Sequence, residues 1–288
     1  MEILTAPSAP AKERILGSMD RLPPFSPVLT KVLATLADED VSLGELAAII
    51  ETDTVLAGNI LRVVNSPLYG RRATINSVRH AVALIGSMKV RNLVLGLSVS
   101  RKWLGARCPR RWSPRQFNLH SLAVAVMSDL LVLKLPVPYP EGAFVAGLMH
   151  DIGKLLIAIA VPEELERIFD LCERGERRVE ECEHNLLGVS HAEVSGLVLD
   201  KWNLPAPIRK GAAAHHSPEE ADEGRLHLSH IVQTADRYIN EIGLGTAPYS
   251  RKPTEEAEHT LRDFGLFDNV ERVAEDFKTE FEVLRAVL

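Results

Sequence analysis

Apolar side chains recur every three or four residues along most of the chain. This spacing is the period of an α-helix that buries one face. Stretches in which apolar and polar residues alternate, as in a half-buried β-strand, do not reach sheet length between Pro24 and Leu288. The pattern therefore predicts an all-α fold.

Start and stop signals predict four helices in the first hundred residues. Ser26-Pro27 offers a capping serine followed by proline at the first helical position. Ser42 and Glu45 have the spacing of a capping box, in which each side chain bonds a backbone amide at the helix start. A third helix is expected over residues 53–64. A fourth, apolar on most faces, is expected to run unbroken over residues 77–100.

The segment 101–115 is rich in arginine and contains two prolines, and we interpret it as a boundary between two halves of the molecule. Its cations would suit a phosphate or nucleic-acid contact, but a solvated linker explains them better. In the second half, helices are expected from Ser113-Pro114, from Pro140-Glu141 through the His150-Asp151 pair, and from Ser190.

Composition narrows the class of protein. The chain has 33 Lys and Arg residues against 39 Asp and Glu, a net charge of −6, so nucleic acid is a disfavoured partner. Cys108, Cys172 and Cys182 lack CxxC spacing and are odd in number, which favours reduced thiols. Charged residues interrupt the first 18 positions, so we expect no signal peptide or membrane anchor, and a cytoplasmic location.

Histidine and aspartate residues in the second half form a candidate metal site. The candidates, in chain order, are His120, His150, Asp151, His191, His215, His216 and Asp236. Adjacent helical residues diverge by about 100°, so the pairs His150-Asp151 and His215-His216 suit two metal positions better than one. Imidazole and carboxylate ligands favour one or two divalent transition-metal ions, namely Fe, Mn, Ni or Zn.

Individual residues in this site have different expected roles. A carboxylate can bridge two ions that activate a water molecule, and Asp151 is the expected bridge. Lys154, one turn beyond His150, would meet a substrate phosphate as a point charge, although capping helix carbonyls explains it as well. For His216 a structural role explains the residue as well as a ligand role does. Five other histidines are left out because a lone helical histidine is usually a hydrogen-bonded structural residue.

The ligand order resembles that of the HD superfamily, particularly its HD-GYP branch. Further motifs extend the resemblance to the HDOD family of bacterial signal-output domains. They are Leu22-Pro23-Pro24, residues 53–61, Asn65-Ser66 with Tyr69-Gly70, residues 83–86, His120-Ser121, residues 147–154, and Leu187-Gly188 with His191.

The resemblance covers residues 22–218 and implies an N-terminal helical bundle (22–105) packed on an HD-like subdomain (113–218). Residues 1–21 are then an N-terminal extension, and residues 219–288 form helices that complete and cap the HD-like subdomain.

Two departures from the HD-GYP pattern affect the expected activity. The residues after His215-His216 lack the Gly-Tyr-Pro element of HD-GYP phosphodiesterases, so hydrolysis of cyclic-di-GMP is not expected. Gln116 stands where some of these enzymes have a glutamate that holds a third metal, and a neutral amide is a much weaker ligand.

Three functions remain after these observations. The sequence favours a signal-transduction output module that binds signalling proteins or a small phosphorylated or nucleotide ligand. The alternative is a metal-dependent phosphohydrolase in which Asp151 and Lys154 act on the substrate. Nucleic-acid binding through residues 101–115 ranks last, and no membrane association is expected.

Overall fold

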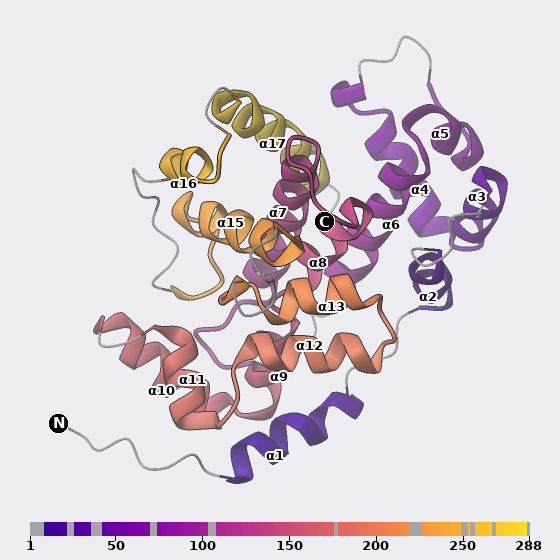
Figure 1. The fold of residues 1–288 in the computed structure, drawn as a ribbon. Helices are drawn as coiled ribbons and strands as arrows, with labels where there is room; N and C mark the ends of the chain where they lie inside the picture. Colours follow the sequence, from indigo (N-terminus) through magenta and orange to yellow (C-terminus); the bar gives the residue numbers. More distant parts are fainter. Residues whose placement is uncertain are drawn as a thin grey trace. The chain divides into compact units, whose positions relative to one another are not determined.

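The computed structural model describes residues 9–21, 26–35, 42–69, 74–102, 108–175, 178–218, 226–248, 253, 257–266 and 269–286. These residues form α-helices, short 3-10 helices and connecting turns, with no strand among them, so the all-α prediction is confirmed (Figure 1). The chain divides into two compact units. Unit 1 combines Met1–Pro23 with Leu104–Val270, and unit 2 combines Pro24–Trp103 with Glu271–Leu288.

Unit 2 is a bundle built on the helices predicted for the first hundred residues. Its helices are α2 (Pro27–Ala34), α3 (Leu43–Glu51), α4 (Thr54–Val64), α5 (Val78–Ile85), α6 (Ser87–Lys102) and, from the C-terminal end of the chain, α17 (Val270–Arg285). Ser26 caps α2, and the capping box of Ser42 and Glu45 opens α3, both as predicted. Leu29, Ile50 and Ile60 are fully buried and show that the apolar stripes face the bundle core.

The prediction of one unbroken helix over residues 77–100 is wrong. Ser77 caps α5 as expected, because its side chain accepts from the backbone amide of His80. The helix ends at Gly86, whose φ of 86° is a left-handed conformation that glycine adopts without a steric penalty. A new helix, α6, begins at the next residue. The apolar periodicity continues through Gly86, which concealed the break.

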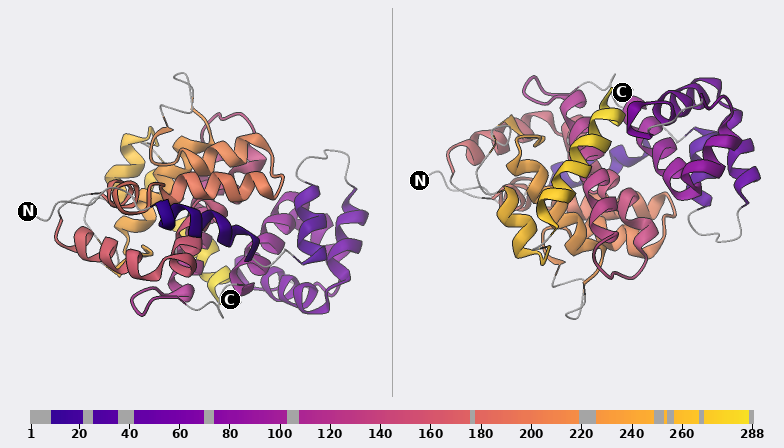
Figure 2. Two further views of the ribbon diagram at one scale, coloured as in Figure 1. Left: turned by 90° about the horizontal axis from the view of Figure 1, so that it is seen from below. Right: turned by 90° about the horizontal axis from the view of Figure 1, so that it is seen from above.

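Unit 1 contains the helices that carry the candidate metal ligands. They are α1 (Ala9–Ser18), α7 (Pro114–Val132), α8 (Ala143–Met149), α9 (Ile152–Ala160), α10 (Pro162–Glu173), α11 (Val179–Leu187), α12 (His191–Lys201), α13 (Ala206–Ala213), α15 (Leu228–Glu241) and α16 (Ala257–Asp263). Helix α7 packs against α8 and α15, and α12 packs against α9 and α13. Figure 2 shows α1 (indigo) running along this unit, where it contacts α9 and α11. The predicted N-terminal extension thus contributes a packed helix.

The segment Pro140–Ala160 is long and apolar enough to span a membrane by composition. However, 83% of its apolar window is buried inside the protein. The segment is also divided between a 3-10 turn (Pro140–Gly142), α8 and α9. These features are those of core helices in a globular unit, and the cytoplasmic location stays a prediction.

The C-terminal residues that were expected to cap the HD-like subdomain divide between the two units. Helix α16 packs against α15 in unit 1. Helix α17 belongs to unit 2, where Glu280 forms an ion pair with Lys89 of α6. Phe277 and Phe281 of α17 are buried and stack on each other.

The arginine-rich segment 101–115 is described only in part. Arg111 forms ion pairs with Asp170 and Glu173 of α10, at 2.7 and 2.6 Å. Other parts of the sequence prediction lie outside the described residues, namely Leu22-Pro23-Pro24, Gly70, residues 103–107 and, in the expected C-terminal helices, residues 219–225.

Candidate metal centre

The structure brings all seven candidate ligands together from five separated segments of unit 1. His120 lies in the middle of α7, His150 and Asp151 in the turn between α8 and α9, His191 at the start of α12, His215 and His216 just after α13, and Asp236 in α15. Six of them are buried, and the His216 side chain is 26% exposed.

The predicted helix running from Pro140 through His150 and Asp151 is wrong. Helix α8 ends at Met149 and α9 begins at Ile152, so the pair occupies the turn between them. In one continuous helix the two side chains would diverge by about 100°. The turn instead directs both side chains to the same buried centre.

Two local features position His191. The predicted capping box at Ser190 is confirmed, because Ser190 and Glu193 exchange hydrogen bonds that fix the first turn of α12. Gly153 of α9 allows α12 to approach closely, since a Cβ at Gly153 would lie 2.0 Å from the carbonyl oxygen of His191. The Gly153 amide also donates to Ser195 Oγ at 2.9 Å.

Four of the side chains form a first cluster. His120 Nε2 lies 3.1 Å from Asp236 Oδ1 and 3.5 Å from Asp151 Oδ2. His150 Nε2 lies 3.5 Å from each of the same two oxygens. Two imidazole nitrogens and two carboxylate oxygens therefore surround one small volume.

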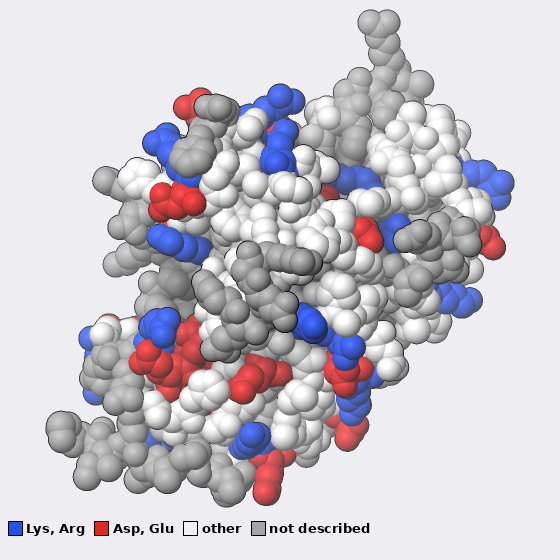
Figure 3. Space-filling model, in the orientation of Figure 1, with Lys and Arg blue, Asp and Glu red and all other residues white. Residues whose placement is uncertain are grey.

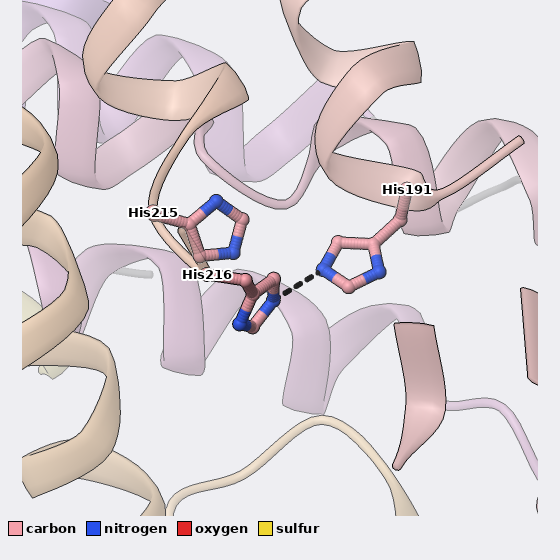
Figure 4. A group of neighbouring side chains, drawn as sticks. All are labelled: His191, His215 and His216. Carbon is pink, nitrogen blue, oxygen red and sulfur yellow. Dashed lines mark hydrogen bonds between the residues drawn. The ribbon is translucent and has the colours of Figure 1, made fainter. Parts of the chain in front are cut away.

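The other oxygen of Asp151 faces a second cluster, which consists of His191, His215 and His216. Figure 4 shows these three histidines pointing toward one another. Asp151 Oδ1 lies 3.4 Å from His191 Nε2 and 3.8 Å from His215 Nε2. His216 Nε2 lies 2.9 Å from His191 Nε2, the contact drawn as a dashed line. Asp151 thus stands between the two clusters, and its role as a bridging ligand stays a prediction.

Hydrogen bonds on the far side of the rings orient three of the imidazoles. In each, Nδ1 contacts a backbone carbonyl oxygen, which can only accept, so Nδ1 carries the proton in the neutral ring. The pairs are His120 with Leu244 (3.0 Å), His150 with Gly147 (2.7 Å) and His215 with Ala212 (2.7 Å). This arrangement leaves the Nε2 lone pairs directed at the centre, as metal coordination requires.

The sequence prediction missed two glutamates that support the other two histidines. Glu183 Oε2 accepts from His191 Nδ1 at 2.6 Å and from the His191 backbone amide at 2.8 Å. Glu180 Oε1 lies 3.0 Å from His216 Nδ1. Glu183 is 1% exposed. In the sequence, Glu183 stands among apolar positions of the segment that forms α11, which was the available signal. The turn at Gly188 separates it from His191 along the chain, so local patterns did not indicate that the two residues are in contact.

Charges and hydrogen bonds in the centre keep the carboxylates of Asp151 and Asp236 ionised. Burial alone would raise the pKa of Asp151, but the charges of His150 and Lys154 hold it well below its usual range. Burial would also raise the pKa of Asp236, but hydrogen bonds with His120 and His150 lower it well below its usual range. His120 is buried as well, yet its hydrogen bonds with Asp151 and Asp236 raise its pKa to about 9, so a metal ion bound at Nε2 would displace a proton there.

Two imidazoles of the second cluster, those of His215 and His216, are kept in the neutral form, whereas Glu183 raises the pKa of His191 against the opposing effect of burial. Burial and the neighbouring His150 and His191 lower the pKa of His215 to about 3. Burial and the neighbouring His215 also lower the pKa of His216. Neutral imidazole is the form that binds a metal ion.

The donor set fits one or two metal ions. Asp151 Oδ1 and His215 Nε2 are buried polar atoms with no hydrogen-bond partner among the described residues. Leaving such atoms unpaired costs about 1–3 kcal/mol each, a penalty that coordination to an ion would remove. Three groups of three side chains have ligand atoms within 4.8 Å of one another, and each draws on the seven candidates.

Lys154 and Gln116 have contacts that bear on their predicted roles. Lys154 Nζ forms an ion pair with Asp151 Oδ2 at 2.7 Å, so its ammonium group contacts a candidate metal ligand. Its contact with a phosphate stays a prediction. Gln116 Nε2 donates to the carbonyl oxygen of Gly245 at 3.2 Å.

Comparison with known proteins gives a consistent family. The HDOD domain model matches residues 22–218 of the chain. An uncharacterized protein of Treponema pallidum (strain Nichols) is 24% identical over 246 residues, which cover 83% of this chain. The match covers 46% of that protein, so the chain spans about half the length of this relative.

Two crystal structures resemble the chain over nearly its whole length. One is an HDOD domain protein with unknown function from Geobacter sulfurreducens, with a TM-score of 0.74 and 23% identity over 96% of each chain. The other is a candidate phosphohydrolase from Shewanella amazonensis SB2B, with a TM-score of 0.75 and 21% identity over 97% of this chain and 100% of that chain. At these identities the two structures establish the shared fold.

Proposed function

The chain belongs to the HDOD family, and from this premise we propose that unit 1 is a metal-dependent phosphohydrolase centred on Asp151. The observation that carries the proposal is the position of Asp151 between two clusters of imidazole nitrogens, one facing each carboxylate oxygen. The sequence left open whether the seven candidate ligands meet in space. All seven lie at one centre, and this supports a metal-dependent hydrolase.

Two sets of residues would hold the ions. His120, His150, Asp236 and Asp151 Oδ2 would hold one, and His191, His215, His216 and Asp151 Oδ1 the other. When bound, divalent ions such as Fe, Mn, Ni or Zn lower the pKa of a coordinated water and polarise a phosphoryl oxygen. Glu183 and Glu180 orient the imidazoles of the second set through their Nδ1 atoms.

Lys154 has two roles in this proposal. Its ammonium group offsets the charge of the buried Asp151 carboxylate through the ion pair at 2.7 Å. In the proposal the same group attracts a phosphate oxygen of the substrate as a point charge.

A signal-output module that binds a ligand without turnover is the second candidate. Two observations favour it. The sequence after His215-His216 lacks the Gly-Tyr-Pro element. Unit 2 is a separate helical unit that carries none of the seven ligands, and it offers a surface for a signalling partner.

The test begins with elemental analysis of the untagged protein by inductively coupled plasma measurement. We expect near-stoichiometric transition metal in the wild type and strong loss in His150→Ala and Asp151→Ala. His80→Ala removes an exposed histidine of α5 in unit 2 and should leave the metal content unchanged.

The second measurement is hydrolysis of p-nitrophenyl phosphate and bis(p-nitrophenyl) phosphate by protein loaded with Mn, Fe, Ni or Zn. Turnover that disappears in Asp151→Ala supports the phosphohydrolase. Full metal content without turnover under all four metals contradicts it and leaves the binding module. A wild-type protein that holds no metal contradicts the phosphohydrolase and likewise leaves the binding module.

A further inference from the structure

An open pocket of about 470 Å³ adjoins the metal centre at His216. Its volume lies within the range of about 300–1,000 Å³ that is usual for small-molecule sites. The walls come from α11, α15 and α16 of unit 1 and include Arg178, Gln233, Arg237, Asp263 and Phe264. Figure 3 shows acidic and basic side chains next to one another on this face, between the levels of α11 and α15.

Arg178 and Arg237 are the lining residues that can bind an anion, and Glu180 and Asp263 are the acidic ones. Arg178 Nε pairs with Glu181 at 3.2 Å, and Arg237 Nε pairs with Glu241 at 2.8 Å. In neither case does a contact among the described residues occupy the terminal amino groups. Planar guanidinium groups bind phosphate through two parallel hydrogen bonds, which is the geometry that these free edges offer.

Arg237 is held by Glu241 on the same helix, and a residue of α16 holds Glu241 in turn. Thr260 of α16 donates to Glu241 Oε2 at 2.6 Å, and the other oxygen of Glu241 accepts from Arg237. Arg237 directly follows Asp236, a candidate metal ligand, along α15. This network holds the guanidinium in the pocket that His216 also lines before any ligand binds, which lowers the entropy cost of binding.

Helix α16 and the turn after it contribute an aromatic ring and a carboxylate to the pocket. Phe264 presents an aromatic ring, and Asp263 presents an exposed carboxylate. An aromatic side chain stacks on a nucleobase, and a carboxylate accepts hydrogen bonds from ribose hydroxyls or an exocyclic amine. Among the lining residues Phe264 is the single aromatic ring apart from His216, which matches one base rather than two.

We infer that this pocket binds a nucleoside monophosphate unit, with the phosphate between Arg178, Arg237 and the metal centre and the base against Phe264. The inference rests on the proposed function in that the phosphate is the group presented to the ions. It specifies the substrate class as a phosphoester carrying one nucleobase.

The inference is tested by isothermal titration calorimetry. The metal-loaded full chain is titrated with adenosine monophosphate and with ribose 5-phosphate, and the two affinities are compared. Chromatography verifies that each ligand remains intact. Replacing a charged hydrogen-bond donor costs about 1.5–3 kcal/mol, so Arg237→Gln and Arg178→Gln should each weaken both ligands about tenfold or more. Phe264→Leu should weaken adenosine monophosphate about tenfold and leave ribose 5-phosphate unchanged.

Arg110→Gln is the matched control, because Arg110 is an exposed arginine of unit 1 outside the pocket lining. Arg178 and Arg237 are 80% and 56% exposed, so their replacement leaves the fold intact. Wild-type affinity for adenosine monophosphate in both arginine variants would overturn the inference, as would equal loss of the two ligands in Phe264→Leu.

The same experiment separates the inference from the proposed function. Arginine-dependent binding of adenosine monophosphate without hydrolysis of any phosphoester supports the pocket and contradicts the phosphohydrolase. Metal-dependent hydrolysis of p-nitrophenyl phosphate together with no detectable binding of adenosine monophosphate retains the phosphohydrolase and overturns the pocket.

Discussion

Asp151 joins the two halves of the candidate metal centre because its carboxylate oxygens face different histidine clusters. Its side chain is fully buried, and a buried charge is costly unless other charges and donors surround it. Lys154, His120 and His150 provide that surrounding. The residues behind the ligands are therefore as important to the centre as the ligands themselves.

Glu183→Gln should weaken metal binding. The change removes the negative charge that accepts from His191 Nδ1, and loss of such a supporting group typically costs about 10–100-fold in metal affinity. Titration against a chromophoric chelator measures this change. Glu163→Gln, at an exposed position of α10, is the control. Equal affinity in the two variants would show that Glu183 does not position His191.

Cys108 should react slowly with iodoacetamide in the folded protein. Burial raises the pKa of its thiol to about 11, from an ordinary value of 9.0. Near pH 8 the thiolate is then about 100-fold scarcer than in the unfolded chain. Mass spectrometry of the Cys108 peptide, with and without urea, measures both rates.

The same shift gives a pH dependence of stability with a definite sign. The folded state favours the neutral thiol, so its contribution is complete below about pH 9 and is lost as the pH rises towards about 11. Equal alkylation rates in folded and unfolded protein would contradict the raised pKa.

At the scale of elements, the contact between α9 and α12 sets the position of His191. The close approach depends on Gly153, and the two helices are further joined through Ser195, whose hydroxyl accepts from the Gly153 amide and donates to the His191 carbonyl. A helix position that tolerates no side chain is a stronger constraint than an apolar stripe, because backbone atoms cannot rotate away.

Gly153→Ala should lower the free energy of unfolding by about 1–3 kcal/mol, because the new Cβ would collide with the His191 carbonyl oxygen and displace α12. Metal affinity should fall with it. Gly58→Ala, in the middle of α4, is the matched control: nothing lies within 4 Å of the added Cβ, so it should be neutral or stabilise by up to about 1 kcal/mol. Urea denaturation compares the two, and equal effects would rule out the steric cause.

On the scale of the whole molecule, the division into two units separates the candidate metal centre from the N-terminal bundle. All seven ligands belong to unit 1, and α3, α4 and α5 belong to unit 2. Binding to the native state stabilises the structure that forms the site, by about 2.7 kcal/mol when free metal is at a hundred times its Kd. The two units should therefore respond differently to metal.

Removal of metal by a chelator should accelerate amide hydrogen exchange in α7, α12 and α15, which carry ligands. Exchange in α3 and α4 should stay nearly constant, because these helices contain none. Hydrogen-exchange mass spectrometry reports both regions in one experiment. A uniform response along the chain, or no response in α7 and α12, would contradict this assignment of the metal to unit 1.

The sequence determined the helical class, the starts of α2, α3, α4 and α12, and the identity of the candidate ligands. Helix starts are readable because a cap such as that of Ser190 and Glu193 joins residues only three apart. The ligands could be identified because the sequence itself shows the adjacent pairs His150-Asp151 and His215-His216, whose residue types are those of metal ligands. The family resemblance is confirmed by the match to the HDOD domain over residues 22–218.

Only the tertiary structure decided how the candidate site is built. The bond from His120 to the Leu244 carbonyl joins residues 124 positions apart, and Glu183 reaches His191 across a turn. The pocket beside His216 likewise draws its arginines and its aromatic ring from three separate helical segments. Such contacts depend on how helices pack rather than on local backbone preference, so periodicity and capping signals carry no information about them.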